Sequence, residues 1–230
     1  MTAPHMTDMD KPPLQIDVVS DVMCPWCYIG KRRLETAIAE ADLALDIRWR
    51  PFQLDPTLPP GGKDRKIYLA EKFGSLERAR ELYENVRQAG DAENIPFAFN
   101  KIEVSPNTLD AHRLIRWAGG IDAVMQDRVV EALFAAYFVD GKHIGDHDTL
   151  VRIAKGTGMD ADLVAELLAG DADREVVASE ITQAQAMGVT GVPTFIVANK
   201  YALVGAQPAA QLAEALRTVA AQQNANDNVA

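Results

Sequence analysis

The 230-residue chain has only two cysteines, Cys24 and Cys27. A small domain held together by several disulfides is therefore excluded. No run of about 18 apolar residues occurs, so the sequence predicts no membrane-spanning helix. Residues 1–13 hold Asp8, Asp10 and a single lysine without an apolar segment, unlike a secretory signal. We therefore expect a cytoplasmic protein, where a close cysteine pair is more often catalytic or metal-binding than structural.

Basic residues are in the minority, with 23 Lys and Arg against 33 Asp and Glu, and the formal net charge is −10. Nucleic acids and anionic membranes bind clusters of basic residues, so we expect neither as a partner. The densest basic run, residues 31–33, is predicted to lie on the solvated face of a helix. Because 48% of the residues are hydrophobic, the chain can bury a substantial core, and its length suits one domain with a large insertion.

The two cysteines lie three residues apart, directly after the apolar run Leu14–Val19. If Cys24 is the N-cap of a helix, Pro25 takes the first helical position, which suits its fixed φ and missing N–H. Cys27 then lies one turn further along the same face, so the two sulfurs can meet. The ring closed by such a disulfide is too small to stabilise the fold much, which favours redox chemistry over a structural role.

The two thiols are predicted to have different roles. The free N–H groups and the dipole at the helix N-terminus stabilise an anion at Cys24, which makes it the attacking thiolate. Cys27, one turn inside the helix, should be less exposed and is the expected resolving thiol.

Apolar periodicity predicts a β-α-β unit at the start of the chain. Residues 14–20 and 45–52 alternate between apolar and polar side chains as strands do, and residues 25–41 have apolar side chains along one face of a helix. Prolines and glycines between residues 56 and 62 then mark a boundary.

The middle of the chain is predicted to be helical, with segments near 75–88, 107 onward, 121–139, 148–155 and 160–169. Asn107 is the expected cap of the second of these helices. A helix at 173–187 follows, then a strand to Val197, a turn at Asn199-Lys200, a strand at 201–204 and a helix from Pro208 to about Ala220.

These elements predict a thioredoxin-like α/β fold with an all-helical insertion domain between its β-α-β half and its C-terminal β-β-α half. We assign residues 12–58 and 172–221 to the thioredoxin-like domain and 59–171 to the insertion. Residues 222–230 are polar and predicted to be a disordered tail.

Four motifs carry a resemblance to a known family. They are Asp21-Val22-Met23-Cys24-Pro25-Trp26-Cys27-Tyr28-Ile29-Gly30-Lys31, Asn107-Thr108 with Ala111-His112-Arg113-Leu114, Gly191-Val192-Pro193, and Gly205-Ala206-Gln207. Over residues 14–220 the chain resembles the DsbA-like branch of the thioredoxin superfamily, and the motifs are similar to those of its FrnE-like group. The resemblance implies a disulfide oxidoreductase or isomerase that exchanges thiols and disulfides of proteins or small molecules. The implied enzyme needs no cofactor beyond the Cys24–Cys27 disulfide, and glutathione is a candidate co-substrate.

The resemblance also implies that the Val192-Pro193 bond is cis and faces the two cysteines. The Val192 backbone would pair with an extended substrate, and the proline would shield the thiols from metal. From the residues alone, an ordinary proline at the start of a strand explains the pattern as well. Strongly oxidising family members carry a histidine where this chain has Trp26. Together with Val192, which has no hydroxyl, this residue predicts a less oxidising disulfide than that of DsbA, suited to reduction or isomerisation.

Two polar residues of these motifs, His112 and Asp21, each have two interpretations. His112 is a candidate neighbour of the active site, but a histidine satisfied by hydrogen bonds inside the helical domain is the favoured explanation, and we do not predict a catalytic role for it. Asp21 is either a carboxylate near the buried thiol or a residue that ends the strand.

Three other functions compete with thiol–disulfide exchange. His143 and His147 have the spacing of a zinc half-site and could join the cysteines, but the long separation and Gly145 argue against it, so we expect no metal. Kappa-class glutathione transferases and 2-hydroxychromene-2-carboxylate isomerases resemble this architecture, but generally place a serine where Cys24 stands. A redox-inert binding module remains the third alternative, and it would tolerate the loss of Cys24.

Overall fold

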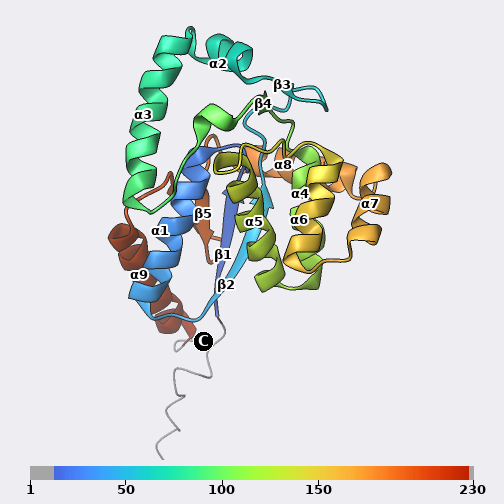
Figure 1. Ribbon diagram of the computed structural model, residues 1–230. Coiled ribbons are helices and arrows are strands. Elements are labelled where there is room, and N and C mark those ends of the chain that lie inside the picture. Colours follow the sequence, from blue (N-terminus) through green and yellow to red (C-terminus); the bar gives the residue numbers. More distant parts are fainter. Residues whose placement is uncertain (1–12, 228–230) are drawn as a thin grey trace, which may run out of the picture.

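The computed structural model describes residues 13–227. Four strands form a mixed sheet in the order β2-β1-β5-β6 (Figure 1). β1 and β2 run parallel, whereas β5 is antiparallel to both β1 and β6. A parallel pair needs a crossover connection, and helix α1 supplies it, as the sequence predicted. These elements are β1 Leu14–Ser20, α1 Pro25–Ala41, β2 Leu45–Pro51, β5 Thr194–Val197 and β6 Tyr201–Val204.

Strand β1 is buried on both faces of the sheet, although Gln15, Asp17 and Ser20 interrupt its apolar residues. Ile16 and Val18 belong to the main core, which includes α1 and α9. Val19 points to the opposite face and packs with Ala184 of α8, because successive side chains of a strand alternate. The two further helices are α8 Arg174–Ala186 and α9 Ala209–Asp227.

Six helices lie between β2 and α8, so the predicted helical insertion between the two halves of the fold is present (Figure 1). It also contains a two-residue ladder of β3 with β4 and a 3-10 turn at Phe99–Lys101. No helix within residues 13–227 is long and apolar enough to cross a membrane. The elements of the insertion are β3 Lys63–Asp64, α2 Arg65–Phe73, α3 Leu76–Ala92, β4 Val104–Ser105, α4 Leu109–Ile121, α5 Ala123–Phe138, α6 His147–Thr157 and α7 Ala161–Ala169.

Three details differ from the sequence prediction. The insertion is not entirely helical, since it contains β3 and β4. The sequence did not predict these strands because two residues are too few to show an alternating pattern. The predicted helix 121–139 begins later, since Asp122 accepts a hydrogen bond from the Met125 N–H and caps α5. Helix α9 continues to Asp227, into the segment predicted to be disordered, and residues 228–230 lie outside the described residues.

The cap of α4 also differs by one residue. Thr108 occupies the N-cap position without a capping bond from its side chain. Asn107, the predicted cap, accepts the Leu109 N–H at 3.0 Å and donates to the Leu58 carbonyl at 2.6 Å. Asn107 therefore joins the start of α4 to the loop that follows β2.

Lys31 is buried, which corrects the prediction that residues 31–33 form a solvated face. Its side chain is 2% exposed and pairs with Glu35, with Asp127 at 3.1 Å and with Glu131 at 3.4 Å. Tyr28, one turn earlier, donates to Glu131 at 2.8 Å. A buried ammonium is tolerated only when carboxylates surround it. These pairs therefore attach α1 to α5 of the insertion.

Gly30 allows α1 to approach the loop before β5. A Cβ at this position would lie 2.7 Å from Cγ of Pro193 and 3.4 Å from the ring of Phe195. The first distance is too short for two carbon atoms, so any side chain here would push the Pro193 loop away from the start of α1.

Replacing Gly30 with alanine therefore tests this contact. Alanine is the better helix former by about 1 kcal/mol, but overpacking a core costs about 1–3 kcal/mol, so Gly30→Ala should lower the free energy of unfolding. Gly156→Ala is the matched control, since a Cβ at Gly156 of α6 meets no atom within 4 Å and this change should stabilise the protein. Urea denaturation measures both, and equal stabilisation by the two variants would rule out a tight contact at Gly30.

Candidate active site

The N-terminus of α1 places the two cysteines as the sequence predicted. Cys24 is the N-cap, with extended backbone angles of φ −92° and ψ 114°, and Pro25 is the first helical residue. The Cys27 N–H donates to the Cys24 carbonyl at 3.0 Å, which begins the first turn. Cys24 is 5% exposed and Cys27 1%, whereas Trp26 between them is 39% exposed. Trp26 is therefore the part of the motif that faces solvent.

The loop before β5 faces Cys24 from the other side. The Val192-Pro193 peptide bond is cis, as the family resemblance implied. The Cys24 Sγ lies 3.7 Å from the Val192 carbonyl oxygen, within range of a thiol hydrogen bond. The Gly205 N–H, at the end of β6, donates to the Pro193 carbonyl at 2.8 Å. The loop is thus tied to the sheet on one side and lies against the Cys24 thiol on the other.

Gly205 and Gln207 serve the turn after β6. Gly205 has a φ of +82°, a conformation that favours glycine. Gln207 Nε2 donates to the Val204 carbonyl at 2.7 Å. Gly205 therefore supports the Pro193 loop through its backbone N–H, and Gln207 closes the turn after β6; among the described hydrogen bonds none joins the Gln207 side chain to a cysteine.

Burial raises the pKa of the Cys27 thiol, and the neighbouring Cys24 raises it further. The Ser20 hydroxyl and the Asp21 backbone oppose this effect, because hydrogen-bond donors favour the thiolate. Burial is the largest of these influences, so Cys27 stays protonated where an exposed thiol would begin to ionise. This fits the resolving role predicted for it.

Asp21 is completely buried and bonds to the backbone on both sides of the site. Its Oδ1 accepts the Met23 N–H at 3.3 Å, and its Oδ2 accepts the Leu54 N–H at 2.7 Å. The carboxylate therefore joins the turn before Cys24 to the loop after β2. The structure supports the interpretation of Asp21 as a residue that ends the strand, because it follows β1 directly and its carboxylate bonds to the Met23 and Leu54 N–H groups; among the described contacts none joins this carboxylate to either thiol.

His112 bonds outside the insertion. Its Nε2 lies 2.8 Å from the carbonyl oxygen of Phe52 and 3.5 Å from Oδ1 of Asp21. The expectation of a histidine satisfied inside the helical domain was therefore wrong about the partner, since Phe52 follows β2. His112 is two contacts away from Cys24, through the Asp21 turn.

The structure does not bring the zinc candidates together. His143 contacts the Gly61 carbonyl at 3.0 Å and accepts the Gly145 N–H, while His147 lies 2.9 Å from Asp110. Among residues 13–227 no group of three or more His, Cys, Asp or Glu side chains is placed to hold a metal ion.

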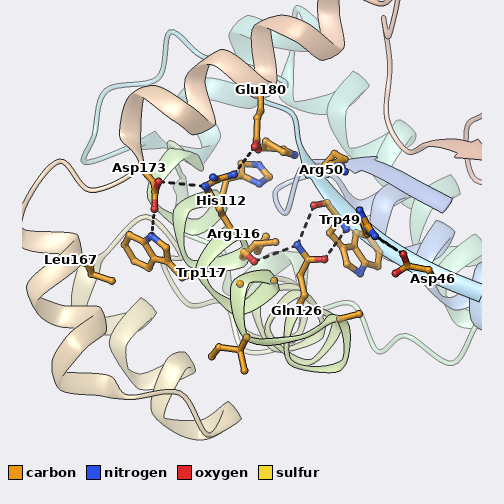
Figure 2. Close-up of a pocket in the computed structure, with 17 residues that line it drawn as sticks. Asp46, Trp49, Arg50, His112, Arg116, Trp117, Gln126, Leu167, Asp173 and Glu180 are labelled. Atoms are coloured by element: carbon orange, nitrogen blue, oxygen red, sulfur yellow. Dashed lines mark hydrogen bonds and ion pairs between the residues drawn. The ribbon is translucent and has the colours of Figure 1, made fainter. Parts of the chain in front are cut away.

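A wide cleft lies beside the sheet rather than at the thiols (Figure 2). It encloses about 750 Å³ between the edge strand β2 and helices α4 and α8. His112, Trp49 and Arg50 line it, and neither cysteine does. Arg116 in the cleft pairs with Glu180 at 2.6 Å, and Arg50 pairs with the buried Asp17 at 2.7 Å. The charges of the cleft are thus largely paired within the protein.

Sequence reasoning missed two residues next to the cysteines. Gly30 follows Cys27 by three positions, on the helix face that meets the Pro193 loop. Ser20, the buried last residue of β1, lowers the pKa of the Cys27 thiol and so opposes the effect of burial. A glycine inside an otherwise regular helix was the available signal for the first, whereas a serine at a strand end gives none.

The raised pKa of Cys27 predicts how stability changes with pH. The folded protein keeps the Cys27 proton while the unfolded chain loses it above about pH 8.5, so the reduced protein should lose stability as pH rises, by up to about 1.4 kcal/mol per pH unit. Tyr28 and Tyr68, whose pKa values burial raises to about 12, should act only above about pH 10. Urea denaturation between these limits should show a smaller loss for Cys27→Ala. Parallel curves for the two proteins would contradict the assignment.

Comparisons with known proteins agree with this geometry. A family model described as the DSBA-like thioredoxin domain matches residues 15–217. A crystal structure of the probable DsbA oxidoreductase SCO1869 from Streptomyces coelicolor is 31% identical, with a TM-score of 0.81 and 89% of each chain covered.

Two more distant structures share the fold alone. A 2-hydroxychromene-2-carboxylate isomerase is 17% identical with a TM-score of 0.69, over 92% of this chain and 98% of that one. The cytosolic disulfide reductase DsbM from Pseudomonas aeruginosa, also solved with GSH, is 18% identical with a TM-score of 0.62, over 91% of this chain and 98% of that one.

The family assignment rests on the extent of these matches together with the fold. The family model spans nearly all the described residues, and the Streptomyces structure is similar over the same length. The predicted thioredoxin-like sheet and helical insertion are both present. This chain belongs to the DsbA-like thioredoxin family.

Proposed function

We propose that this protein is a thiol–disulfide oxidoreductase that reduces or isomerises disulfides of proteins or small molecules through Cys24-Pro25-Trp26-Cys27. The placement of the two cysteines carries the proposal. The Cys24 Sγ lies at the N-terminus of α1 and 3.7 Å from the Val192 carbonyl, with Cys27 buried one turn further on. This arrangement supports a nucleophilic thiol, a resolving thiol and a backbone site for substrate in one place.

In the first step, the Cys24 thiolate attacks one sulfur of a substrate disulfide. A Cys24–substrate bond forms, the substrate S–S bond breaks, and the other substrate sulfur leaves as a thiolate that takes a proton from solvent. The thiolate is the reactive form in exchange.

In the second step, Cys27 loses its proton and attacks the Cys24 sulfur. The Cys24–Cys27 disulfide forms, and the second substrate sulfur leaves as a thiolate. Two protein thiols are oxidised and one substrate disulfide is reduced. A thiol such as glutathione then returns the protein to its dithiol form, or substrate rearrangement before the second step gives isomerisation.

Residues around Cys24 would hold the substrate. The exposed ring of Trp26 offers an apolar surface beside the thiol. The Val192 backbone, next to the cis bond, can pair with an extended chain as in strand addition. Pro193, packed toward Gly30, would cover the thiols against metal.

The reducing or isomerising direction rests on Trp26 and Val192. Trp26 cannot carry a positive charge and Val192 has no side-chain hydroxyl to stabilise the thiolate at Cys24, so the disulfide should be less oxidising than one with a histidine in the motif. The resemblance to the FrnE-like group and the name of DsbM, a cytosolic disulfide reductase solved with GSH, support a cytoplasmic reductase that uses glutathione.

Single-cysteine variants test the roles of the two thiols. Cys24→Ser should abolish reduction of insulin disulfides, because the attacking thiolate is lost. Cys27→Ser should accumulate mixed disulfides with substrate through Cys24, because nothing resolves them. Non-reducing electrophoresis and mass spectrometry measure the trapped species. Mixed disulfides that form only through Cys27 would reverse the assignment.

The redox potential tests the role of Trp26. A charged histidine at this position would add a favourable interaction with the Cys24 thiolate, and about 30 mV corresponds to 1.4 kcal/mol for this two-electron couple. Trp26→His should therefore make the protein more oxidising by tens of millivolts, as measured by equilibration with glutathione buffers. Trp26→Phe, which adds no charge, is the control and should change the potential less. An unchanged or more reducing Trp26→His variant would contradict this account.

Glutathione conjugation separates this function from that of the transferases and isomerases of similar architecture. The protein should turn over disulfides and show no conjugation of glutathione to electrophilic substrates. Conjugation that survives in Cys24→Ser would instead place the protein with the glutathione-dependent enzymes.

A further inference from the structure

The turn after β6 connects the Pro193 loop to the helix that carries both cysteines. The Gly205 N–H donates to the Pro193 carbonyl at 2.8 Å, and the Ala206 carbonyl accepts a hydrogen bond from Nη1 of Arg33 at 2.6 Å. Arg33 belongs to α1 and follows Gly30 by three residues, so it lies on the helix face that meets the Pro193 loop. The loop is therefore attached to α1 through two hydrogen bonds in series.

Glu93 fixes the direction of the Arg33 guanidinium. Glu93 is the C-cap of α3 and accepts a hydrogen bond from Nε of Arg33 at 2.7 Å. The two side chains are 18% and 20% exposed, so solvent screens this pair less than a pair on the surface. Because a guanidinium is planar, holding Nε on one side directs Nη1 toward the Ala206 carbonyl. Arg33 thus joins α1, the end of α3 and the turn after β6.

The turn after β6 keeps its own structure without Arg33. Gln207 bonds to the Val204 carbonyl through its side chain at 2.7 Å and to the Gly205 carbonyl through its N–H at 2.9 Å. Helix α9 follows the turn and packs against α1 (Figure 1), which keeps the turn near this helix. Arg33 therefore sets the spacing between the turn and α1 rather than the fold of the turn.

This spacing matters at Val192, the residue before Pro193. The Val192 carbonyl oxygen lies 3.7 Å from the Cys24 Sγ. The Pro193 ring meets α1 at Gly30, where packing opposes closer approach but does not prevent separation. The two hydrogen bonds through the turn after β6 are directional and oppose separation. They therefore limit how far the Val192 backbone can move from the thiol.

We propose that Arg33 is a positioning residue that keeps the Val192 backbone at the distance from Cys24 that polypeptide substrates need. This inference rests on the proposed function. An extended substrate chain uses the Cys24 sulfur for exchange and the Val192 N–H and C=O groups for pairing, so the spacing of these groups affects its binding. A small disulfide without a peptide backbone uses the sulfur alone. Arg33 therefore favours polypeptide disulfides over small ones, without touching either.

Oxidation of the reduced protein by an excess of disulfide tests this role. The two oxidants are bis(2-hydroxyethyl) disulfide and a pair of extended peptides joined by a disulfide, and the protein thiols are counted after acid quenching. Arg33→Met keeps an apolar stem but has no donor. It should raise the half-saturating peptide concentration about threefold to tenfold, the effect of losing about one backbone hydrogen bond. The maximal rate with peptide and the rate with the small disulfide should stay within about twofold of wild type.

A methylated peptide makes the test specific for the Val192 backbone. Methylating in turn the backbone nitrogens on either side of the peptide's cysteine removes the donors that can pair with the Val192 carbonyl. One of these changes should weaken binding to the wild-type protein about threefold to tenfold. It should weaken binding to Arg33→Met less, because that pairing is already impaired. A general loss of stability in Arg33→Met would leave the two effects independent.

Matched variants separate the positioning role from the loss of any paired arginine. Arg32→Met removes a neighbouring arginine of α1, which pairs with Glu35 at 3.0 Å and with Glu131, and it should leave the half-saturating peptide concentration within about twofold. Glu93→Ala should raise this concentration, because the guanidinium loses its direction. Glu93→Gln should raise it less, because the amide oxygen still accepts a hydrogen bond from Nε. Urea denaturation shows whether each variant is folded, and the two Glu93 variants carry the test if Arg33→Met does not fold.

The outcomes distinguish this inference from the proposed function. A wild-type protein whose thiols are oxidised by neither disulfide would refute the function itself. A wild-type protein oxidised by both, with an unchanged half-saturating peptide concentration in Arg33→Met, would overturn the positioning role alone. Equal effects of Arg33→Met on the peptide and on the small disulfide, or an equal effect of Arg32→Met, would likewise overturn it.

Discussion

The active site depends on the contact between the first turns of α1 and the Val192-Pro193 loop. These segments are 168 residues apart in sequence, yet the Cys24 Sγ lies 3.7 Å from the Val192 carbonyl. The contact exists because Gly30 presents no side chain to the Pro193 ring. A shift of either segment would separate the proposed nucleophile, Cys24, from the backbone proposed to bind substrate.

Paired polar groups hold this contact from the side of the insertion. Lys31 and Tyr28 bond to carboxylates of α5, and Asp21 bonds to the backbone before Cys24 and after β2. Buried ion pairs add little net stability because desolvation offsets their attraction. These pairs instead fix how α1 is oriented on α5, because an orientation that separated the partners would leave a buried charge without a counter-charge. The insertion thus fixes the orientation of the helix that carries both thiols.

The two thiols differ because of their surroundings. Cys24 lies at the helix terminus under the Val192 carbonyl, beside the exposed Trp26 ring. Cys27 is buried, and burial raises its pKa. The surroundings of Cys27 thus exclude solvent, whereas an exposed ring lies next to Cys24.

The sequence by itself determined the features that depend on a few neighbouring residues. Cys24 as N-cap, Pro25 at the first helical position, the β-α-β unit and the hairpin after Val197 follow from spacing and periodicity, and the family resemblance implied the cis bond at Pro193. Only the tertiary structure decided that Lys31 is buried, that Gly30 must lack a side chain, and that Arg33 bonds to the turn after β6. The partners of these residues lie far along the chain, Asp127 being 96 residues from Lys31. Local periodicity and capping carry no information about such distant neighbours, so burial and pairing there are set by how the helical insertion packs on the sheet.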